Sequence, residues 1–192
     1  MLTLSKRHQI TMGIVLAILM IATRGHHFAI AKQILPSASW AVFFLAGVYL
    51  RPTWVLAGLF GLASFLDFAA IGWAGVSDYC MSPAYVALIP AYGALWLAGR
   101  WYAGRYTFKL ATLLPLAAAA LAGIAISEVI SSGSFYFFSG RFAETTFAGF
   151  GARLLKYGPH YLATTAFWIG VAAIVHATVV ATRSSAVKPT RA

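Results

Sequence analysis

Residues 110–131 read LATLLPLAAAALAGIAISEVIS, an apolar run of 22 residues in which Glu128 is the one charged side chain. A helix of about 20 apolar residues crosses the hydrocarbon core of a bilayer, so this run predicts a membrane-spanning helix. Comparable runs give six predicted membrane segments, at residues 9–23, 37–50, 53–74, 83–99, 110–131 and 159–181. The expected fold class is therefore an all-α integral membrane protein with six transmembrane helices.

The composition points the same way. Of the 192 residues, 61% are hydrophobic and 9% are charged, whereas a soluble domain has about 25% charged residues. We expect one membrane domain over residues 1–192, with a polar tail at 183–192. The net charge of +10 does not indicate nucleic-acid binding, because the cations lie at segment ends rather than on one face.

Prolines mark several predicted boundaries. Pro83 and Pro159 fall at segment starts, where a missing N–H costs nothing, and Ser82 fits the N-cap before Pro83. Pro90 and Pro115 lie inside apolar runs, where they predict either a kink or a shifted boundary.

The distribution of cations predicts the orientation. With the N-terminus inside, nine Lys and Arg residues lie on the inner side and five on the outer side, which favours two cytoplasmic termini. The inner set is Lys6, Arg7, Arg51, Arg100, Arg105, Lys109, Arg183, Lys188 and Arg191, and the outer set is Arg24, Lys32, Arg141, Arg153 and Lys156. The loops rich in polar and aromatic residues then face outward, so we expect a binding site on the outer face.

One of these outer loops, Gly75-Val-Ser-Asp-Tyr-Cys-Met-Ser-Pro83, contains the single cysteine of the chain. Cys80 cannot form an intrachain disulfide, and its thiolate is a soft ligand for a metal. The positive end of a helix starting at Pro83 favours the thiolate, whereas Asp78 opposes it. The alternative is an inert thiol that acts as a small hydrophobic side chain.

Other residues are expected near this thiol. Tyr79 and Met81 flank it, and Tyr85 lies one turn into the following predicted helix. Asp67 is an ionisable group inside an apolar segment, which indicates either a functional site or an interior ion pair. Its expected partner is Arg153, for which Glu128 and Glu144 compete.

Small residues four positions apart occur on two segments, as Gly13 with Ala17 and as Ala57 with Gly61. They permit close helix–helix contact. Internal packing is the first interpretation, and a docking stripe for a membrane partner is the second.

A six-helix chain of this length with short basic inner loops resembles the substrate-binding (S) components of energy-coupling factor (ECF) transporters. The segment Ser77–Pro83, with Tyr85, Asp67 and Arg153, is similar to the BtuM family, the predicted vitamin B12 (cobalamin) transporters. The resemblance implies a bacterial cytoplasmic membrane protein whose Cys80 loop faces the periplasm. It also implies an energising module, a transmembrane coupling protein with ATPases, that docks near Gly13 and Ala17.

The resemblance further implies the chemistry. The Cys80 thiolate would bind the cobalt of cobalamin and displace cyanide from cyanocobalamin. Asp67, Tyr85 and Arg153 would position the corrin, with Tyr79 and Met81 beside the thiol. The aromatic residues expected to wall the ligand are Tyr79, Phe135, Tyr136 and Phe138.

Three alternatives remain. The chain is an S component for another vitamin, with Cys80 incidental, or a membrane haem or quinone redox protein that uses some of its five histidines. The histidines His8, His26, His27, His160 and His176 form no evident facing pair. A ligand-free membrane scaffold is the third alternative, and it leaves Asp67 unexplained.

Overall fold

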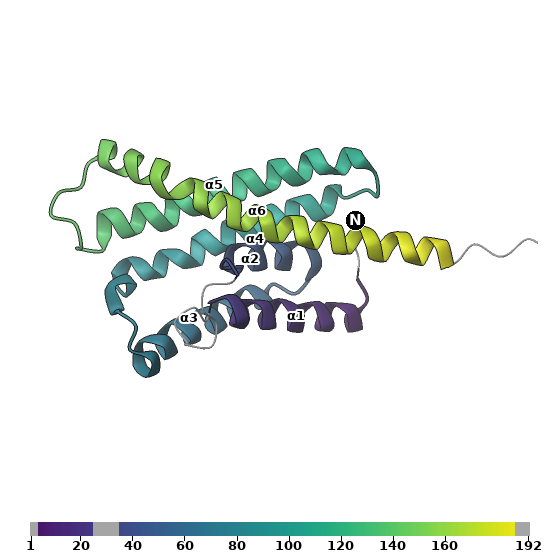
Figure 1. The fold of residues 1–192 in the computed structure, drawn as a ribbon, viewed down its shortest axis with the longest axis horizontal. Coiled ribbons are helices and arrows are strands. Elements are labelled where there is room, and N and C mark those ends of the chain that lie inside the picture. Colours follow the sequence, from purple (N-terminus) through teal and green to yellow (C-terminus); the bar gives the residue numbers. More distant parts are fainter. Residues whose placement is uncertain (1–3, 25–34, 187–192) are drawn as a thin grey trace, which may run out of the picture.

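The structure, a computed structural model, describes residues 4–24 and 35–186, with the side chains of all but residues 74, 80 and 183–186. This part of the chain contains helices and no strand, which confirms the all-α class (Figure 1). The six α-helices are α1 (Lys6–Arg24), α2 (Ser39–Tyr49), α3 (Trp54–Ala74), α4 (Leu88–Arg105), α5 (Leu113–Phe138) and α6 (Phe147–Ala186). Three short 3-10 helices accompany them, η1 (Asp78–Cys80), η2 (Pro83–Ala87) and η3 (Leu110–Thr112).

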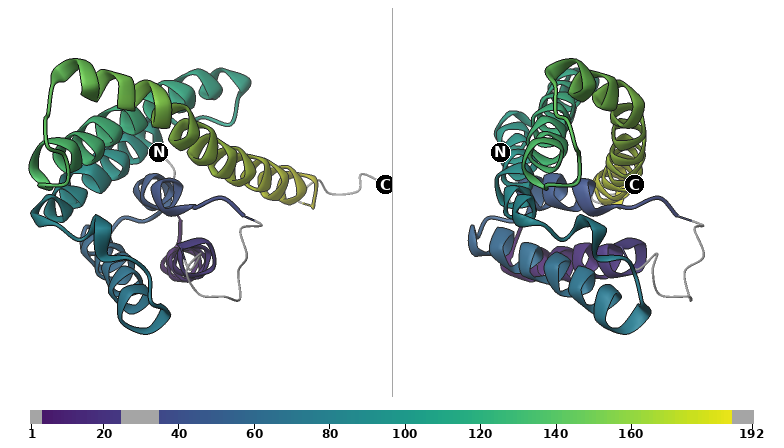
Figure 2. Two further views of the ribbon diagram at one scale, coloured as in Figure 1. Left: turned by 60° about the vertical axis from the view of Figure 1, so that its left-hand side comes forward. Right: turned by 90° about the vertical axis from the view of Figure 1, so that its left-hand side faces the viewer.

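Helix α2 is the centre of the bundle. It lies between α1 and α3 on one side and α5 and α6 on the other, and it packs along α4 (Figure 2). Phe43 and Phe44 in this helix are fully buried. Thr23 joins its start to the end of α1, since the Thr23 hydroxyl accepts a hydrogen bond from the Ala38 N–H at 3.0 Å.

Within residues 4–24 and 35–186, three helices are long and apolar enough to cross a membrane, over Trp54–Trp73 in α3, Leu110–Phe138 in η3 and α5, and Phe147–Thr182 in α6. Their outward faces carry large apolar side chains, such as Trp73 at 77% exposed and Leu155 at 81% exposed. Water would disfavour so much apolar surface, and lipid would not. The chain is therefore a membrane protein, with α2 as a short buried helix of 11 residues.

The helix boundaries differ from the predicted ones at several prolines. Pro90 and Pro115 lie in the first turns of α4 and α5, so each marks a shifted boundary rather than a kink. Pro159 lies inside α6, and the prediction that it starts the helix is wrong. The helix begins earlier because Thr146 caps it, accepting from the Gly149 N–H at 3.0 Å.

Helix α5 continues past the predicted end at residue 131 to Phe138. Polar residues at this point indicated a loop, but the helix satisfies them internally. The Ser132 hydroxyl donates to Glu128 Oε1, four residues earlier, at 2.6 Å. Helix α4 likewise extends past residue 99, because Arg100 donates to the carbonyl oxygens of Leu50 and Arg51 at 2.9 Å each.

The closest helix contact involves two glycines that the small-residue pattern did not single out. A Cβ added to Gly47 in α2 would overlap the Trp96 carbonyl, and one added to Gly99 in α4 would overlap the Phe44 carbonyl. By contrast, a Cβ on Gly61 would meet nothing within 4 Å, and one on Gly13 would meet Leu50 at 3.9 Å. Close packing is thus concentrated between α2 and α4.

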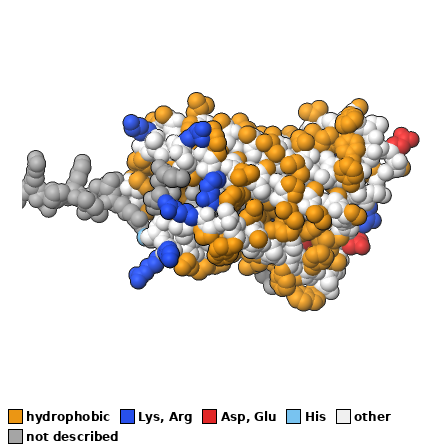
Figure 3. Space-filling model, turned by 180° about the vertical axis from the view of Figure 1, so that it is seen from behind, with side chains coloured by type: hydrophobic (Ala, Val, Ile, Leu, Met, Phe, Trp, Pro, Cys, Tyr) orange, Lys and Arg blue, Asp and Glu red, His pale blue; other side chains and the backbone are white. Residues whose placement is uncertain are grey.

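The two ends of the bundle differ in charge. The start of α1, the α2–α3 turn, the α4–α5 turn and the end of α6 lie at one end, here called the basic end (Figure 1). Lys and Arg side chains gather toward it, and Asp and Glu side chains lie toward the opposite, acidic end (Figure 3). Lys32, His26, His27, Lys188 and Arg191 lie outside the described residues, and so does the predicted tail beyond residue 186.

Candidate functional site

A cavity of about 730 Å³ lies at the acidic end, between the end of α1, α3, the η1–η2 segment, α5 and α6. We call it the outer cavity. Asp67 from α3, Tyr79 and Met81 from the η1 segment, Tyr85 from η2 and Arg153 from α6 all line it. The structure therefore brings together five of the six residues singled out from sequence, although they come from four separate elements. Their role in binding stays a prediction.

The sixth residue, Cys80, is the last residue of η1. Its side chain lies outside the described part of the structure, but its backbone stands between Tyr79 and Met81, both of which line the outer cavity. The turn is closed by the Met81 N–H, which donates to the Asp78 carbonyl at 2.7 Å. The chain reaches this turn because Gly75 ends α3 in the left-handed conformation, at φ 67°.

The predicted helix start, with Ser82 at the N-cap position and Pro83 as first helical residue, is confirmed, but the first turns are a 3-10 helix. Pro83 starts the five-residue η2, and α4 begins only at Leu88. Ser82 holds the N-cap position of η2 but makes no side-chain capping bond. η2 runs into α4 without a break, since Ala87 and Leu88 both have helical backbone angles. The stabilisation of a Cys80 thiolate by this helix start stays a prediction.

Asp67 pairs with Arg24, and the predicted Asp67–Arg153 pair is wrong. Arg24 Nε donates to Asp67 Oδ1 at 2.7 Å, and Nη2 donates to Oδ2 at 2.6 Å. The planar guanidinium matches both carboxylate oxygens. Arg24 is the partner of Asp67 because α1 ends beside α3, whereas Arg153 lies on α6.

The Arg24 guanidinium also joins two further helices. Its Nη1 donates to the Ser39 hydroxyl at 2.9 Å in α2 and to the Tyr92 hydroxyl at 3.2 Å in α4. Tyr92 is held by stacking on Phe43, with ring centroids 4.1 Å apart. Sequence reasoning missed Ser39 and Tyr92. The available signal was Arg24 itself, an end-of-helix cation on the same predicted side as Asp67.

Tyr85 completes this cluster from η2. Its hydroxyl donates to Asp67 Oδ2 at 2.8 Å and lies 3.4 Å from the Ser64 hydroxyl. Burial raises the pKa of Tyr85 from 10.0 to about 12, with the Ser64 bond acting against the shift and the Asp67 bond adding to it. Tyr85 therefore stays protonated at neutral pH and acts as a donor. We call Arg24, Ser39, Asp67, Tyr85 and Tyr92 the polar cluster.

Arg153 lies among aromatic rings. Its guanidinium carbon is 4.8 Å from the Phe142 ring centroid, 5.2 Å from Tyr157 and 5.7 Å from Tyr136. Its Nε is buried and has no hydrogen-bond partner among the described residues. Within the same residues, neither Glu128 nor Glu144 forms an ion pair with it. Arg153 thus presents an unused donor in a residue that lines the outer cavity.

Aromatic side chains form part of the cavity wall. Tyr79 packs on Phe135 with centroids 5.6 Å apart, and both line the cavity. Trp40 and Tyr161 form a second lining pair, stacked at 4.9 Å, which the sequence did not indicate. Phe135, Tyr136 and Phe138 belong to the last turns of α5 rather than to a loop.

The histidines are spread along the bundle. His160 lines the outer cavity, whereas His176 is sixteen residues further along α6, a distance of about 24 Å in a helix. Among the described residues, no group of three or more His, Cys, Asp and Glu side chains is placed to hold a metal ion.

The outer cavity combines a soft sulfur at its edge in Met81, hydroxyls, an arginine donor and flat aromatic rings. Such a lining suits a large ligand with flat faces and a polar rim. No protein-family model matches the chain, and no curated protein matches its sequence.

Proposed function

We propose that this chain binds cobalamin in the outer cavity for uptake across the membrane, with the Cys80 thiolate bound to cobalt. The observation that carries the proposal is the gathering of Asp67, Tyr79, Met81 and Tyr85 with Arg153 in one cavity beside the Cys80 backbone. The volume of about 730 Å³ is within the range of about 300–1,000 Å³ for ligand sites. Cobalamin is larger than a drug-sized ligand, so part of it remains outside the cavity.

The lining supports this ligand class. A corrin offers flat faces to aromatic rings, such as Tyr79 and Trp40, and a rim of amides to hydroxyls, such as Ser131 and Thr164. The Arg153 side chain lines the cavity, and a guanidinium can donate to an amide oxygen. The corrin itself supplies four equatorial nitrogen ligands, so cobalt needs one axial donor from the protein, and a thiolate is a soft donor.

With cyanocobalamin, the proposed reaction is a ligand exchange. A thiolate electron pair forms the Co–S bond, and cyanide leaves with the electron pair of the Co–C bond. The oxidation state of cobalt is unchanged, so this step needs no redox cofactor. The polar cluster holds the η2 side of the cavity in place through Tyr85.

The proposal includes a topology. All six α-helices act as an S-component-like bundle in a bacterial cytoplasmic membrane, with both termini in the cytoplasm and the outer cavity toward the periplasm. It is supported by the cations at the basic end (Figure 3) and by the positive-inside rule. An energising module then docks on the exposed face of α1, which carries Ile14 and Ile18 beside Gly13 and Ala17.

A growth test addresses uptake. A bacterial strain that requires vitamin B12 and lacks other uptake routes is transformed with the wild-type gene, with Cys80→Ala or with an empty vector. The proposal predicts growth on low cyanocobalamin only with the wild type. Growth no better than the vector, from a chain that is expressed and folded, would favour an S component for another vitamin.

A further inference from the structure

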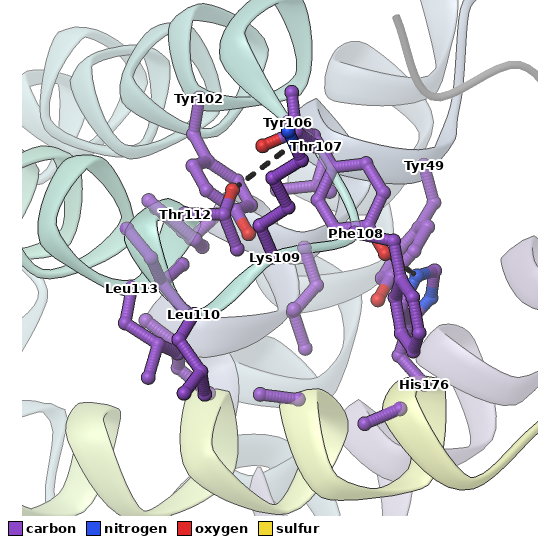
Figure 4. A pocket seen from close by; sticks show the side chains of 17 residues that line it. Tyr49, Tyr102, Tyr106, Thr107, Phe108, Lys109, Leu110, Thr112, Leu113 and His176 are labelled. Carbon is purple, nitrogen blue, oxygen red and sulfur yellow. Dashed lines mark hydrogen bonds between the residues drawn. The ribbon is translucent and has the colours of Figure 1, made fainter. Parts of the chain in front are cut away.

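A second cavity, of about 420 Å³, lies at the basic end and shares no lining residue with the outer cavity. It is bounded by α2, by residues 106–113 between α4 and α5, and by α6 (Figure 4). We call it the inner cavity. Phe44, Val48, Leu116 and Ile169 line it, and its volume is also typical of a ligand site. The proposed function makes no use of it.

One side of the inner cavity is polar. His176 Nε2 and the Tyr106 hydroxyl form a hydrogen bond of 2.9 Å, and the two rings meet edge to face at 5.2 Å. Lys109 lines the same cavity from the α4–α5 turn (Figure 4). The Thr107 N–H donates to Thr112 Oγ1 at 3.3 Å and so holds this turn closed. The cavity therefore has an apolar interior with a cation and a hydrogen-bonding pair in its wall.

The turn itself has the character of a membrane interface. Lys109 stands between Phe108, which is 57% exposed, and Leu110, which is 86% exposed. Apolar side chains of this size are disfavoured in water, and a lysine between them can place its charge at the headgroup level. The same three residues, Phe108, Lys109 and Leu110, also line the inner cavity.

The cations at the basic end (Figure 3) favour an anionic ligand over a cationic one. Arg105, the last residue of α4, lies four positions before Lys109, and the Asp and Glu side chains visible in Figure 3 lie toward the acidic end. Basic pockets at the cytoplasmic ends of membrane helices attract anionic lipid headgroups.

We propose that the inner cavity holds one acyl chain of an anionic phospholipid from the leaflet at the basic end, with its phosphate paired to Lys109. The apolar interior takes the chain, and the Tyr106–His176 pair lies beside the ester region. A lipid held here packs α6 against α2 and the α4–α5 turn. This site is independent of cobalamin, and its test does not involve the outer cavity.

Native mass spectrometry of the purified chain tests the site. The protein is stripped in detergent and then given phosphatidylglycerol or phosphatidylcholine with identical acyl chains. The expected result is one retained phosphatidylglycerol per wild-type chain, and less phosphatidylcholine. Lys109→Gln should lower phosphatidylglycerol retention about fivefold, the effect of one interfacial cation, and lower phosphatidylcholine retention less, because the choline cation offsets the charge of its phosphate.

Two further variants test whether the lipid occupies the inner cavity and whether the effect is specific to Lys109. Ala173→Phe fills the inner cavity from α6 and should lower the retention of both lipids, whereas Lys156→Gln, a matched cation change at the acidic end, should change neither. An oleate arm distinguishes a free fatty acid, which lacks the phosphate, from the phospholipid. Equal retention of the two phospholipids, unchanged retention in Lys109→Gln, or displacement of phosphatidylglycerol by equimolar oleate overturns the proposal. If Ala173→Phe does not fold, the Lys109→Gln comparison decides alone.

Discussion

Arg24 and Asp67 form a bidentate ion pair that joins the end of α1 to α3 beside the outer cavity. Arg24 Nε lies 2.7 Å from Asp67 Oδ1, and Nη2 lies 2.6 Å from Oδ2. Their side chains are 15% and 22% exposed, so both charges are largely removed from water. Ionised groups in such a place persist only when they are paired. The pair therefore fixes the position of two helices and, through Tyr85, of one wall of the cavity.

Asp67→Asn should destabilise the fold because it leaves Arg24 without its counter-charge. A fully buried pair loses about 3–5 kcal/mol when one partner is removed, and partial exposure lowers the expected loss to about 2–3 kcal/mol. SDS titration in mixed micelles measures it, with Asp78→Asn, an exposed acid in η1, as the control. Equal unfolding midpoints for Asp67→Asn and the control would contradict the role of the pair.

Tyr85→Phe should lower the stability by about 1 kcal/mol, the usual cost of one hydrogen bond. It should also alter the response to alkali. The pKa of Tyr85 is raised by burial from 10.0 to about 12, so its contribution is complete below pH 10 and is lost as the pH rises toward 12. The melting-temperature difference between wild type and Tyr85→Phe should therefore shrink over this range. A difference that stays constant would show that Tyr85 is not the titrating group.

Gly99→Ala should be strongly destabilising, because the added methyl group would overlap the Phe44 carbonyl and force α2 and α4 apart. Overpacking of this kind costs about 1–3 kcal/mol or more. Gly93→Ala is the matched control in the same helix, since a Cβ there meets nothing within 4 Å. That control should be neutral or stabilising by up to about 1 kcal/mol. Similar effects of the two substitutions on the melting temperature would refute the close α2–α4 contact.

Single-cysteine labelling tests the orientation. In a Cys80→Ala background, Ala143→Cys lies in the exposed α5–α6 connection and Thr53→Cys lies in the exposed α2–α3 turn. The positive-inside rule predicts that a membrane-impermeant maleimide labels position 143 in intact spheroplasts and position 53 only after lysis. The reverse pattern would invert the proposed topology.

The sequence predicted the helical class and the approximate helices well. An apolar run long enough to span a bilayer has to satisfy its backbone hydrogen bonds within itself, and a helix does so. The prediction failed where polar residues find partners inside a helix. Ser132 and Glu128 bond within α5, and Thr146 starts α6 ahead of Pro159. Neither hydrogen bond changes the hydropathy pattern. The predicted helix boundaries were therefore placed at the nearest polar residue or proline.

The candidate site was predictable as a set of residues but not as a set of pairs. Asp67 and Tyr85 were expected near each other, and they share a bond of 2.8 Å. The partner of Asp67 could not be derived, because Arg24 and Arg153 were both placed on the outer side and only the packing of α1 against α3 separates them. The Trp40–Tyr161 stack could not be derived for the same reason. Only the packing of the helices brings together these two residues, which are 121 positions apart in the chain.

The visible absorption spectrum of the purified chain with cyanocobalamin tests the central claim most directly. Wild type and Met81→Leu should both show shifted corrin bands and release cyanide, whereas Cys80→Ala should show neither change; the Met81 variant excludes the adjacent thioether as the ligand. Identical, unshifted bands in wild type and Cys80→Ala would contradict thiolate ligation of cobalt.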